Sequence, residues 1–227
     1  MTSPSPRALR SWSSGKDSAW ALHVLSQRPD LEVVGLLTTF NEAFSRVAMH
    51  AVRRELVEDQ AAAAGLPLVP VLLPYPCTNE VYELRMRAAL TEAKAAGITH
   101  MAFGDLFLAD IREYRVRLLE GTGVEPLFPL WGRDTRTLAR EMIDGGLRAR
   151  LTCVDPRVLD RALAGRAFDA TLLAELPPGV DPCGENGEFH TFVFAGPNFA
   201  RPVTYTLGEY VLRDGRFGYR DLLPVEG

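Results

Sequence analysis

The chain has 227 residues, of which 47% are hydrophobic and 24% are charged, and its formal net charge is −4. This composition is typical of a soluble globular protein with one large domain or one domain and a smaller lobe. The acidic balance gives no overall positive field for nucleic acid, no apolar run is long enough to span a membrane, and residues 1–10 lack the apolar core of a signal peptide. We therefore expect a cytoplasmic protein that does not act on membranes or nucleic acid.

The cysteines and histidines do not form a recognisable metal or disulfide pattern. Cys77, Cys153 and Cys183 are odd in number and widely separated, and no C-x-x-C pair is present. Such spacing predicts neither a disulfide framework nor a zinc knuckle. The four histidines are scattered without the spacing of metal ligands.

Residues 13–18, Ser-Ser-Gly-Lys-Asp-Ser, follow a short apolar run and precede a helical segment. A loop at a helix N-terminus presents free N–H groups and the positive end of the helix dipole, which favour an anion. Lys16 adds a positive charge, and three serines add hydroxyl donors. The glycines of a Walker loop and of a dinucleotide fingerprint are missing. We interpret this stretch, the phosphate loop, as a phosphate-binding site; the alternative is a polar turn that caps an ordinary helix.

Strands and helices are predicted to alternate through residue 103. Residues 31–40 form an apolar run typical of a strand buried on both faces. Residues 49–64 predict a helix that ends at Gly65, and residues 68–73 a strand near an edge, because Pro70 cannot donate to a ladder. Residues 79–96 predict a helix that Asn79 caps, with Val81, Leu84 and Ala88 on one apolar face. Residues 98–103 predict another strand.

This alternation predicts an α/β fold, a parallel sheet with helices on both faces. Ligands of such sheets bind beyond the carboxyl ends of the strands. We therefore expect residues 13–18, residues 38–41 and Gly104-Asp105 to meet at one edge. Residues 110–117 predict a charged helix whose arginines either reach the site or form a solvated face.

The pattern changes in the C-terminal third. Residues 126–132 predict a rigid turn. Asp134 is expected to cap a helix that runs through Ile143, and residues 147–154 predict a strand. Residues 181–192 combine carboxylates, an amide, a thiol and an imidazole with two glycines. They predict a loop facing substrate or Mg²⁺, and the alternative is a tight turn with Asx-type hydrogen bonds. Residues 203–219, with a turn signal at residues 213–216, predict antiparallel strands. We expect an ATP-binding domain at residues 1–150 and a smaller substrate domain at residues 151–227.

Taken together, the motifs resemble those of the diphthine–ammonia ligase family, a branch of the PP-loop ATP pyrophosphatases. The matching pieces are residues 13–18, 104–105, 129–131 and 184–188, in the order of the family. The resemblance implies a Rossmann-like, HUP-type domain followed by a small α+β lobe. It also implies that a carboxylate attacks the α phosphate of MgATP to give an acyl-adenylate and pyrophosphate, and that ammonia then displaces AMP. In the family the carboxylate belongs to diphthine, a modified histidine of translation elongation factor 2.

The resemblance and the residue types together imply roles for individual side chains. The expected ATP-binding residues are Ser13, Ser14, Gly15, Lys16, Asp17, Ser18, Thr38, Thr39, Phe40, Gly104 and Asp105. Asp17 and Asp105 are the expected Mg²⁺ ligands. The expected substrate-binding residues are Arg112, Arg115, Glu185, Asn186 and Glu188. The expected catalytic residues are Lys16, Asp17, Glu185, Glu188 and His190, with His190 moving the proton that ammonium loses.

Two departures from the family pattern stand out. Ser14 replaces a glycine of the family loop, and His190 replaces a third acid after residue 188. We expect a bacterial relative, for which the carboxylate, the nucleophile and the oligomeric state are not set by the sequence; a homodimer is one option. Two alternatives are an RNA-modifying PP-loop enzyme and a non-catalytic ATP or AMP sensor. The acidic charge and the lack of paired cysteines argue against the RNA-modifying enzyme.

Overall fold

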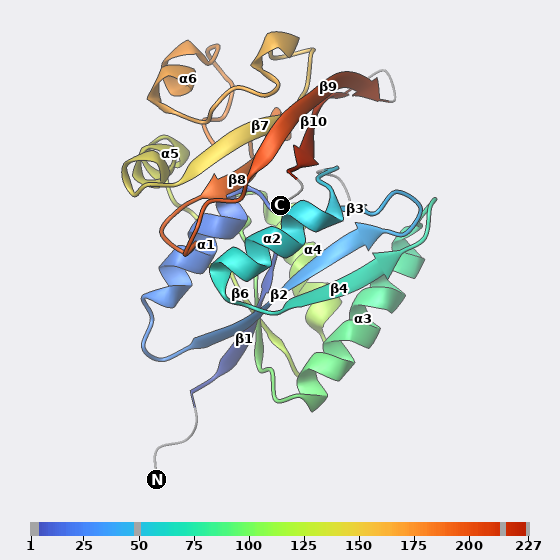
Figure 1. Cartoon of the computed structure of the whole chain (residues 1–227). Coiled ribbons are helices and arrows are strands. Elements are labelled where there is room, and N and C mark those ends of the chain that lie inside the picture. The colour runs from blue at the N-terminus through green and yellow to red at the C-terminus, as the bar shows by residue number, and fades with distance from the viewer. Residues whose placement is uncertain (1–4, 48–50, 214–216, 226–227) are drawn as a thin grey trace.

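Two sheets organise the chain, which a computed structural model describes at residues 5–47, 51–213 and 217–225 (Figure 1). The first sheet contains β1 (Arg7–Ser11), β2 (Glu32–Asn41), β3 (Arg46–Val47), β4 (Leu68–Leu73), β5 (His100–Ala102) and β6 (Glu125–Leu127). Its order is β3-β2-β1-β5-β6, and β4 pairs with β2. Every pairing is parallel except that of β2 with β3. The predicted parallel sheet, and the edge position of β4, are confirmed.

Helices cover both faces of this sheet, as the alternation of elements predicts. Residues of α1 (Lys16–Ser26) and α2 (Arg54–Ala64), such as Leu22 and Leu56, join one buried cluster. Residues of α3 (Asn79–Ala95) and α4 (Ala109–Leu119), such as Met86 and Leu118, join another. The sheet therefore separates two apolar cores, which is the layered arrangement of an α/β fold.

Three details of the predicted elements are wrong. The buried face of α3 contains Met86, Leu90 and Ala93, whereas Leu84 is 68% exposed, because the helix carries two apolar stripes and only one contacts the sheet. Thr78, not Asn79, caps this helix. β6 overlaps the start of the segment predicted as a turn, residues 126–132, because Pro126 and Pro129 obscure a strand of three residues.

The start of α2 also differs from the prediction. The helix begins at Arg54, and part of the predicted first turn, residues 49–50, lies outside the described residues. Its end is as predicted, since Gly65 adopts the left-handed conformation, with φ at 66°, that favours glycine.

The second sheet is antiparallel and lies in the upper part of Figure 1 with α5 (Thr135–Asp144) and α6 (Ala170–Glu175). It contains β7 (Arg148–Val154), β8 (Phe189–Ala195), β9 (Tyr205–Arg213) and β10 (Phe217–Pro224), in the order β8-β7-β10-β9. A short 3₁₀ helix (Arg161–Leu163) follows β7. The predicted turn at residues 213–216 falls largely outside the described residues, but the strands on either side pair as expected. Residue 150 lies inside β7, and the division of the chain there stays a prediction.

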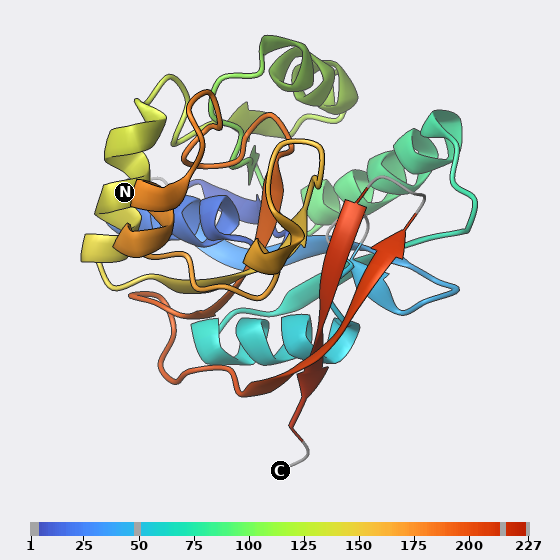
Figure 2. The ribbon, with the colours of Figure 1, turned by 90° about the horizontal axis from the view of Figure 1, so that it is seen from above.

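The two sheets share one core and several polar contacts. Phe192 of β8 and Leu222 of β10 join the same buried cluster as Leu22 of α1. Seen from above in Figure 2, β10 runs beside α2. These contacts bring the start of β8 to the carboxyl ends of β1 and β5. Across the residues that the structure describes, no helix combines the length and the hydropathy needed to cross a membrane.

Candidate active site

A polar cavity of about 190 Å³ lies between the first sheet and the segment that leads into β8. Its walls come from the ends of β1 and β5, the start of α1, α4, residues 183–185 and the start of β8. The expected site residues that line it are Ser13, Gly15, Lys16, Asp17, Ser18, Gly104, Asp105, Arg115, Glu185 and His190. The two motif regions, which lie more than a hundred residues apart in the sequence, therefore face one space.

The backbone of the phosphate loop is held by its own serines and by β8. Ser13 N donates to Ser18 Oγ at 3.0 Å, and the two hydroxyl oxygens lie 2.7 Å apart. Gly15 is the N-cap of α1 and supplies no side-chain cap, whereas Thr191 Oγ1 accepts from Lys16 N at 3.0 Å. A Cβ atom on Gly15 would lie 3.2 Å from the Thr191 carbonyl oxygen, so the glycine permits this close approach.

Ser14 differs from its neighbours because its side chain is buried away from the cavity. Its φ is 70°, a left-handed conformation that favours glycine, and this accounts for the glycine of the family loop. The Ser14 hydroxyl has no hydrogen-bond partner among the described residues. Its carbonyl oxygen accepts from Gln60 Nε2 at 3.1 Å and Val193 N at 3.0 Å. Ser14 therefore shapes the loop through its backbone.

Lys16 is a buried ammonium with a fixed set of partners. Its Nζ lies 2.8 Å from Asp17 Oδ2 and donates to the Cys183 carbonyl oxygen. It also lies 5.3 Å and 5.7 Å from the ring centroids of Phe189 and Phe168. Burial lowers the pKa of Lys16, but the Asp17 carboxylate outweighs this effect and the pKa lies above its ordinary value. Lys16 is thus a fixed positive charge at the start of α1.

Two carboxylate oxygens in the cavity fit a divalent cation. Asp17 Oδ1 and Asp105 Oδ2 are buried and have no hydrogen-bond partner within the described residues. Carboxylate oxygens are the ligands that Mg²⁺ takes, commonly one or two of them together with substrate phosphates. No group of three or more His, Cys, Asp or Glu in the described ranges is arranged as a metal site. The residues present therefore fit a cation that arrives with phosphates better than one held by protein alone.

The acidic loop, residues 181–188, is closed by two of its own carboxylates. Glu188 Oε1 accepts from Asp181 N and from Asn186 Nδ2, each at 3.0 Å, and the side chain is 7% exposed. Asp181 Oδ2 accepts from Glu185 N at 2.9 Å. Neither Glu188 nor Asn186 lines the cavity. In this structure they build the loop, as the tight-turn alternative predicts.

Glu185 and His190 face the cavity with shifted pKa values. Glu185 Oε1 accepts from Leu106 N at 2.7 Å, and burial raises the pKa of Glu185 to about 7. Burial, with a smaller effect of the Lys16 charge, lowers the pKa of His190 to about 4. At neutral pH, His190 is therefore uncharged, and Glu185 is close to its midpoint.

Several expected site residues lie elsewhere. The Thr38 hydroxyl donates to the Trp12 carbonyl oxygen at 2.9 Å, and Phe40 is 1% exposed in the core. Thr39 belongs to the same strand and does not line the cavity. The Arg112 guanidinium lies 4.7 Å from the ring centroid of Trp131, over a separate surface hollow. Their assignment to nucleotide or substrate stays a prediction that this cavity does not support.

Three residues that support the site were not identified from the sequence. Arg10 is fully buried beneath Gly104 and donates to the carbonyl oxygens of Ser18 at 3.1 Å and Ala102 at 2.7 Å. Gln60 accepts from the Trp12 indole and donates to the Ser14 and Val193 carbonyls. The third residue is Thr191. The sequence does carry a signal for two of them: Arg10 is a charge within an apolar strand, and Gln60 is an amide within the apolar stripe of a helix.

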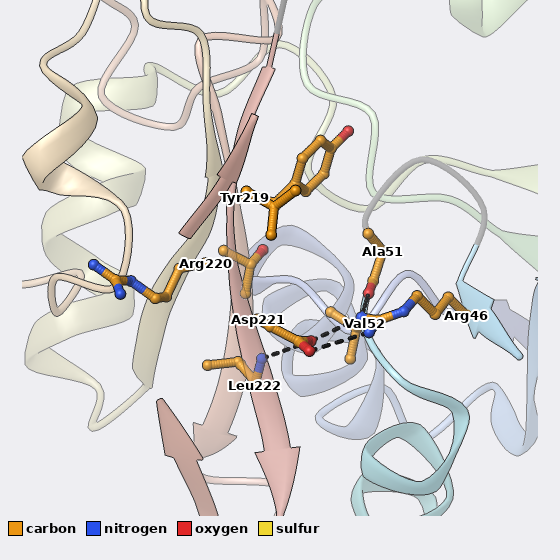
Figure 3. Close-up of a pocket in the computed structure, with 9 residues that line it drawn as sticks. Arg46, Ala51, Val52, Tyr219, Arg220, Asp221 and Leu222 are labelled. Atoms are coloured by element: carbon orange, nitrogen blue, oxygen red, sulfur yellow. Dashed lines mark hydrogen bonds and ion pairs between the residues drawn. The ribbon is translucent and has the colours of Figure 1, made fainter. Parts of the chain in front are cut away.

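A second cavity, of about 40 Å³, lies between β10 and the start of α2 (Figure 3). There Asp221 Oδ1 lies 2.8 Å from Arg46 NH1, and Asp221 Oδ2 lies 2.7 Å from Arg53 NH2. Burial raises the pKa of Asp221, but the two arginines outweigh it and bring the value to about 2. This carboxylate is already neutralised and the space is small, so the first cavity is the candidate functional site.

The chain is similar to known proteins along most of its length. Residues 7–125 match the family model of the diphthamide synthase N-terminal domain, and residues 134–213 match that of the diphthamide synthase C-terminal domain. The diphthine–ammonia ligase of Homo sapiens is 30% identical over 140 residues, which cover 59% of this chain and 51% of that protein. The diphthine–ammonia ligase of Danio rerio is 33% identical over 112 residues, which cover 46% of this chain and 44% of that protein. The chain spans about half the length of the curated relatives it matches.

Proposed function

The chain belongs to the diphthamide synthase family, and on that premise we propose that it is an ATP-dependent ligase that forms an amide from a carboxylate and ammonia. The observation that carries the proposal is the single cavity lined by both the phosphate loop and the acidic loop. A carboxylate oxygen attacks the α phosphorus of ATP and pyrophosphate leaves. Ammonia then attacks the acyl carbon, and AMP leaves.

The phosphate loop and Lys16 are proposed to bind the ATP phosphates. The start of α1 supplies N–H groups and the positive end of the helix dipole. Lys16 supplies a charge whose position Asp17 and the Cys183 carbonyl fix before any ligand binds. A preorganised charge of this kind stabilises the negative charge that develops on leaving pyrophosphate.

Asp17 and Asp105 would hold Mg²⁺ through the two carboxylate oxygens that have no partner in the described part of the chain. When bound, Mg²⁺ neutralises phosphate charge during the transfer. Arg10, beneath these residues, fixes the first turn of α1 against the end of β5 through its bonds to Ser18 and Ala102.

Glu185 is proposed to accept the proton that ammonium must lose before it attacks. Its pKa of about 7 matches the working range of a general base, and its side chain lines the cavity. His190, with a pKa of about 4, is a much weaker base at neutral pH. We therefore propose that Glu185 accepts the proton and that His190 lines the cavity as an uncharged side chain.

The substrate carboxylate is proposed by analogy with the relatives. The named relatives are diphthine–ammonia ligases, and a protein-bound diphthine is the corresponding candidate here. The expected bacterial origin, the cytoplasmic location and the domains at residues 1–150 and 151–227 remain part of the proposal. The ligase names of the relatives favour this function over RNA modification and over a sensor.

A screen of carboxylates tests the function. The protein is incubated with MgATP, ammonium and single carboxylates, including a diphthine-bearing elongation factor, and AMP and pyrophosphate are measured. The proposal expects equal amounts of both products, which depend on ammonium and on one class of carboxylate. ADP and phosphate as the products would contradict it, and tight ATP binding without any AMP would favour a sensor.

A further inference from the structure

Arg115 is a cavity cation with unused hydrogen-bonding capacity. Lys16 Nζ is already bonded to Asp17 and to the Cys183 carbonyl, and Arg10 donates to backbone carbonyls beneath the cavity. Arg115 lines the cavity, and its Nε is buried without a hydrogen-bond partner in the described part of the chain. A buried donor of a charged group without a partner is unfavourable, which points to a ligand atom.

The orientation of Arg115 is nevertheless fixed. Its guanidinium lies 5.2 Å from the ring centroid of Phe103, and its NH1 donates to the Tyr82 hydroxyl at 3.2 Å. Phe103 follows β5 and Tyr82 belongs to α3, so two separate elements hold one side chain. Neither contact uses Nε, which is left for another acceptor.

Asp105 faces this donor without bonding to it. Arg115 Nε and Asp105 Oδ2 lie 3.9 Å apart, beyond hydrogen-bond distance, and both atoms are buried without partners among the described residues. An anionic oxygen at Arg115 Nε together with a cation at Asp105 Oδ2 would satisfy both atoms and keep the charges balanced. A phosphate group with its divalent cation provides both, whereas a free carboxylate would be repelled by Asp105.

We infer that Arg115 binds a phosphate oxygen of the nucleotide, in addition to the charge that Lys16 supplies in the same cavity. This inference rests on the proposed function, because it requires that the cavity bind MgATP. It reassigns Arg115 from the carboxylate substrate, where the sequence placed it, to the nucleotide. The planar guanidinium, held over the Phe103 ring and bonded to the Tyr82 hydroxyl, is a group that recognises phosphate oxygens.

Calorimetric binding of MgATP, AMP and adenosine to the full chain tests this inference. Arg115→Met should lower the affinity for MgATP and for AMP by about 10- to 100-fold, because a hydrogen bond to a charged group is lost. Adenosine carries no phosphate, and its affinity should not change. Arg117→Met is the matched control on the same helix, since Arg117 is exposed and does not line the cavity, and it should bind all three ligands as the unmodified chain does.

Arg115→Lys keeps the charge but lacks the planar group, so it should lower the affinity for MgATP by less than Arg115→Met does. This second variant keeps the inference testable if the methionine variant does not fold. Unchanged MgATP affinity in a folded Arg115→Met protein would overturn the inference, as would an equal loss for adenosine. If the unmodified chain binds no MgATP, both the inference and the proposed function fail. If it binds MgATP and the variants bind as well, only the inference fails.

Discussion

The phosphate loop and the acidic loop border the same cavity but are stabilised in different ways. The phosphate loop depends on distant residues, because Gln60 and Val193 donate to the Ser14 carbonyl and Thr191 accepts from the Lys16 amide. The acidic loop depends largely on its own carboxylates, since Glu188 accepts from the backbone and side chains of the same eight residues.

A residue of a motif can therefore have one of two roles: it can shape the loop, or it can face the cavity. In the acidic loop, Glu188 is used to close the loop and Glu185, three residues earlier, faces the cavity. In the phosphate loop, Ser14 serves through its backbone and Lys16 through its charge. A motif thus identifies a loop, whereas the contacts decide which of its side chains reach a ligand.

The largest expected effect is on turnover, at Lys16. Lys16→Met keeps an unbranched side chain at this position but removes the charge, and we expect kcat to fall by about 100- to 1,000-fold. The measurement is AMP formation with the carboxylate that the screen identifies, and Lys94→Met, at an exposed lysine of α3, is the control that should retain kcat. Turnover of Lys16→Met near that of the control would remove Lys16 from the mechanism.

The next effect is on stability, at Glu188. Glu188→Ala removes a buried acceptor of two hydrogen bonds, so the free energy of unfolding should fall by about 2–3 kcal/mol in urea denaturation. Asn186→Ala, at an exposed side chain of the same loop, should cost less than about 1 kcal/mol. A Glu188→Ala protein that is fully stable but inactive would instead place Glu188 among the catalytic residues.

The third effect depends on pH, at Glu185. Its folded pKa of about 7 lies above the ordinary value of 4.5, so the unfolded chain ionises first as the pH rises. The folded state therefore loses stability between about pH 4.5 and 7, and Glu185→Gln does not share this loss. We expect the variant to be more stable than the unmodified chain by about 3 kcal/mol at pH 8 and nearly equal at pH 4. Urea denaturation at both pH values measures this, and an equal difference at both would contradict the raised pKa.

The smallest effect is a gain, at Ser14. Ser14→Gly relieves a left-handed conformation and removes a buried hydroxyl without a partner in the described residues, so the free energy of unfolding should rise by about 1 kcal/mol. Ser45→Gly is the matched control, because Ser45 also has a positive φ, of 47°, but its side chain is exposed. The free energy of unfolding of Ser45→Gly should rise only by the amount that comes from relieving the backbone conformation. A thermal melt that shows Ser14→Gly to be less stable would mean that the hydroxyl has a favourable contact.

The fold could be predicted from the sequence where local signals were unambiguous. The apolar run of β2 and the glycine that ends α2 each specify an element without knowledge of the rest of the chain. The buried face of α3 could not be predicted, because Leu84 and Met86 belong to different apolar stripes and only the position of the sheet selects one. The three residues of β6 carry too short a pattern to distinguish a strand from a turn.

The candidate site was predictable as a pair of loops but not as a network. Both loops carry local motifs, and the structure places them on one cavity. Gln60 and Thr191, in contrast, act on residues 46 and 175 positions away in the chain, and such contacts leave no local pattern. The roles of Glu185 and Glu188 are also set by partners, since both are acids in the same short motif.

The hydrogen bond from Val193 N to the Ser14 carbonyl joins β8 of one sheet to the loop after β1 of the other. Any motion that separates the two sheets at the cavity must break this bond and expose the Val193 amide to solvent. Hydrogen–deuterium exchange at Val193 therefore measures how often the cavity opens, on a timescale that no equilibrium affinity reports. A nucleotide that bridges the phosphate and acidic loops should slow this exchange, even though Val193 itself does not line the cavity.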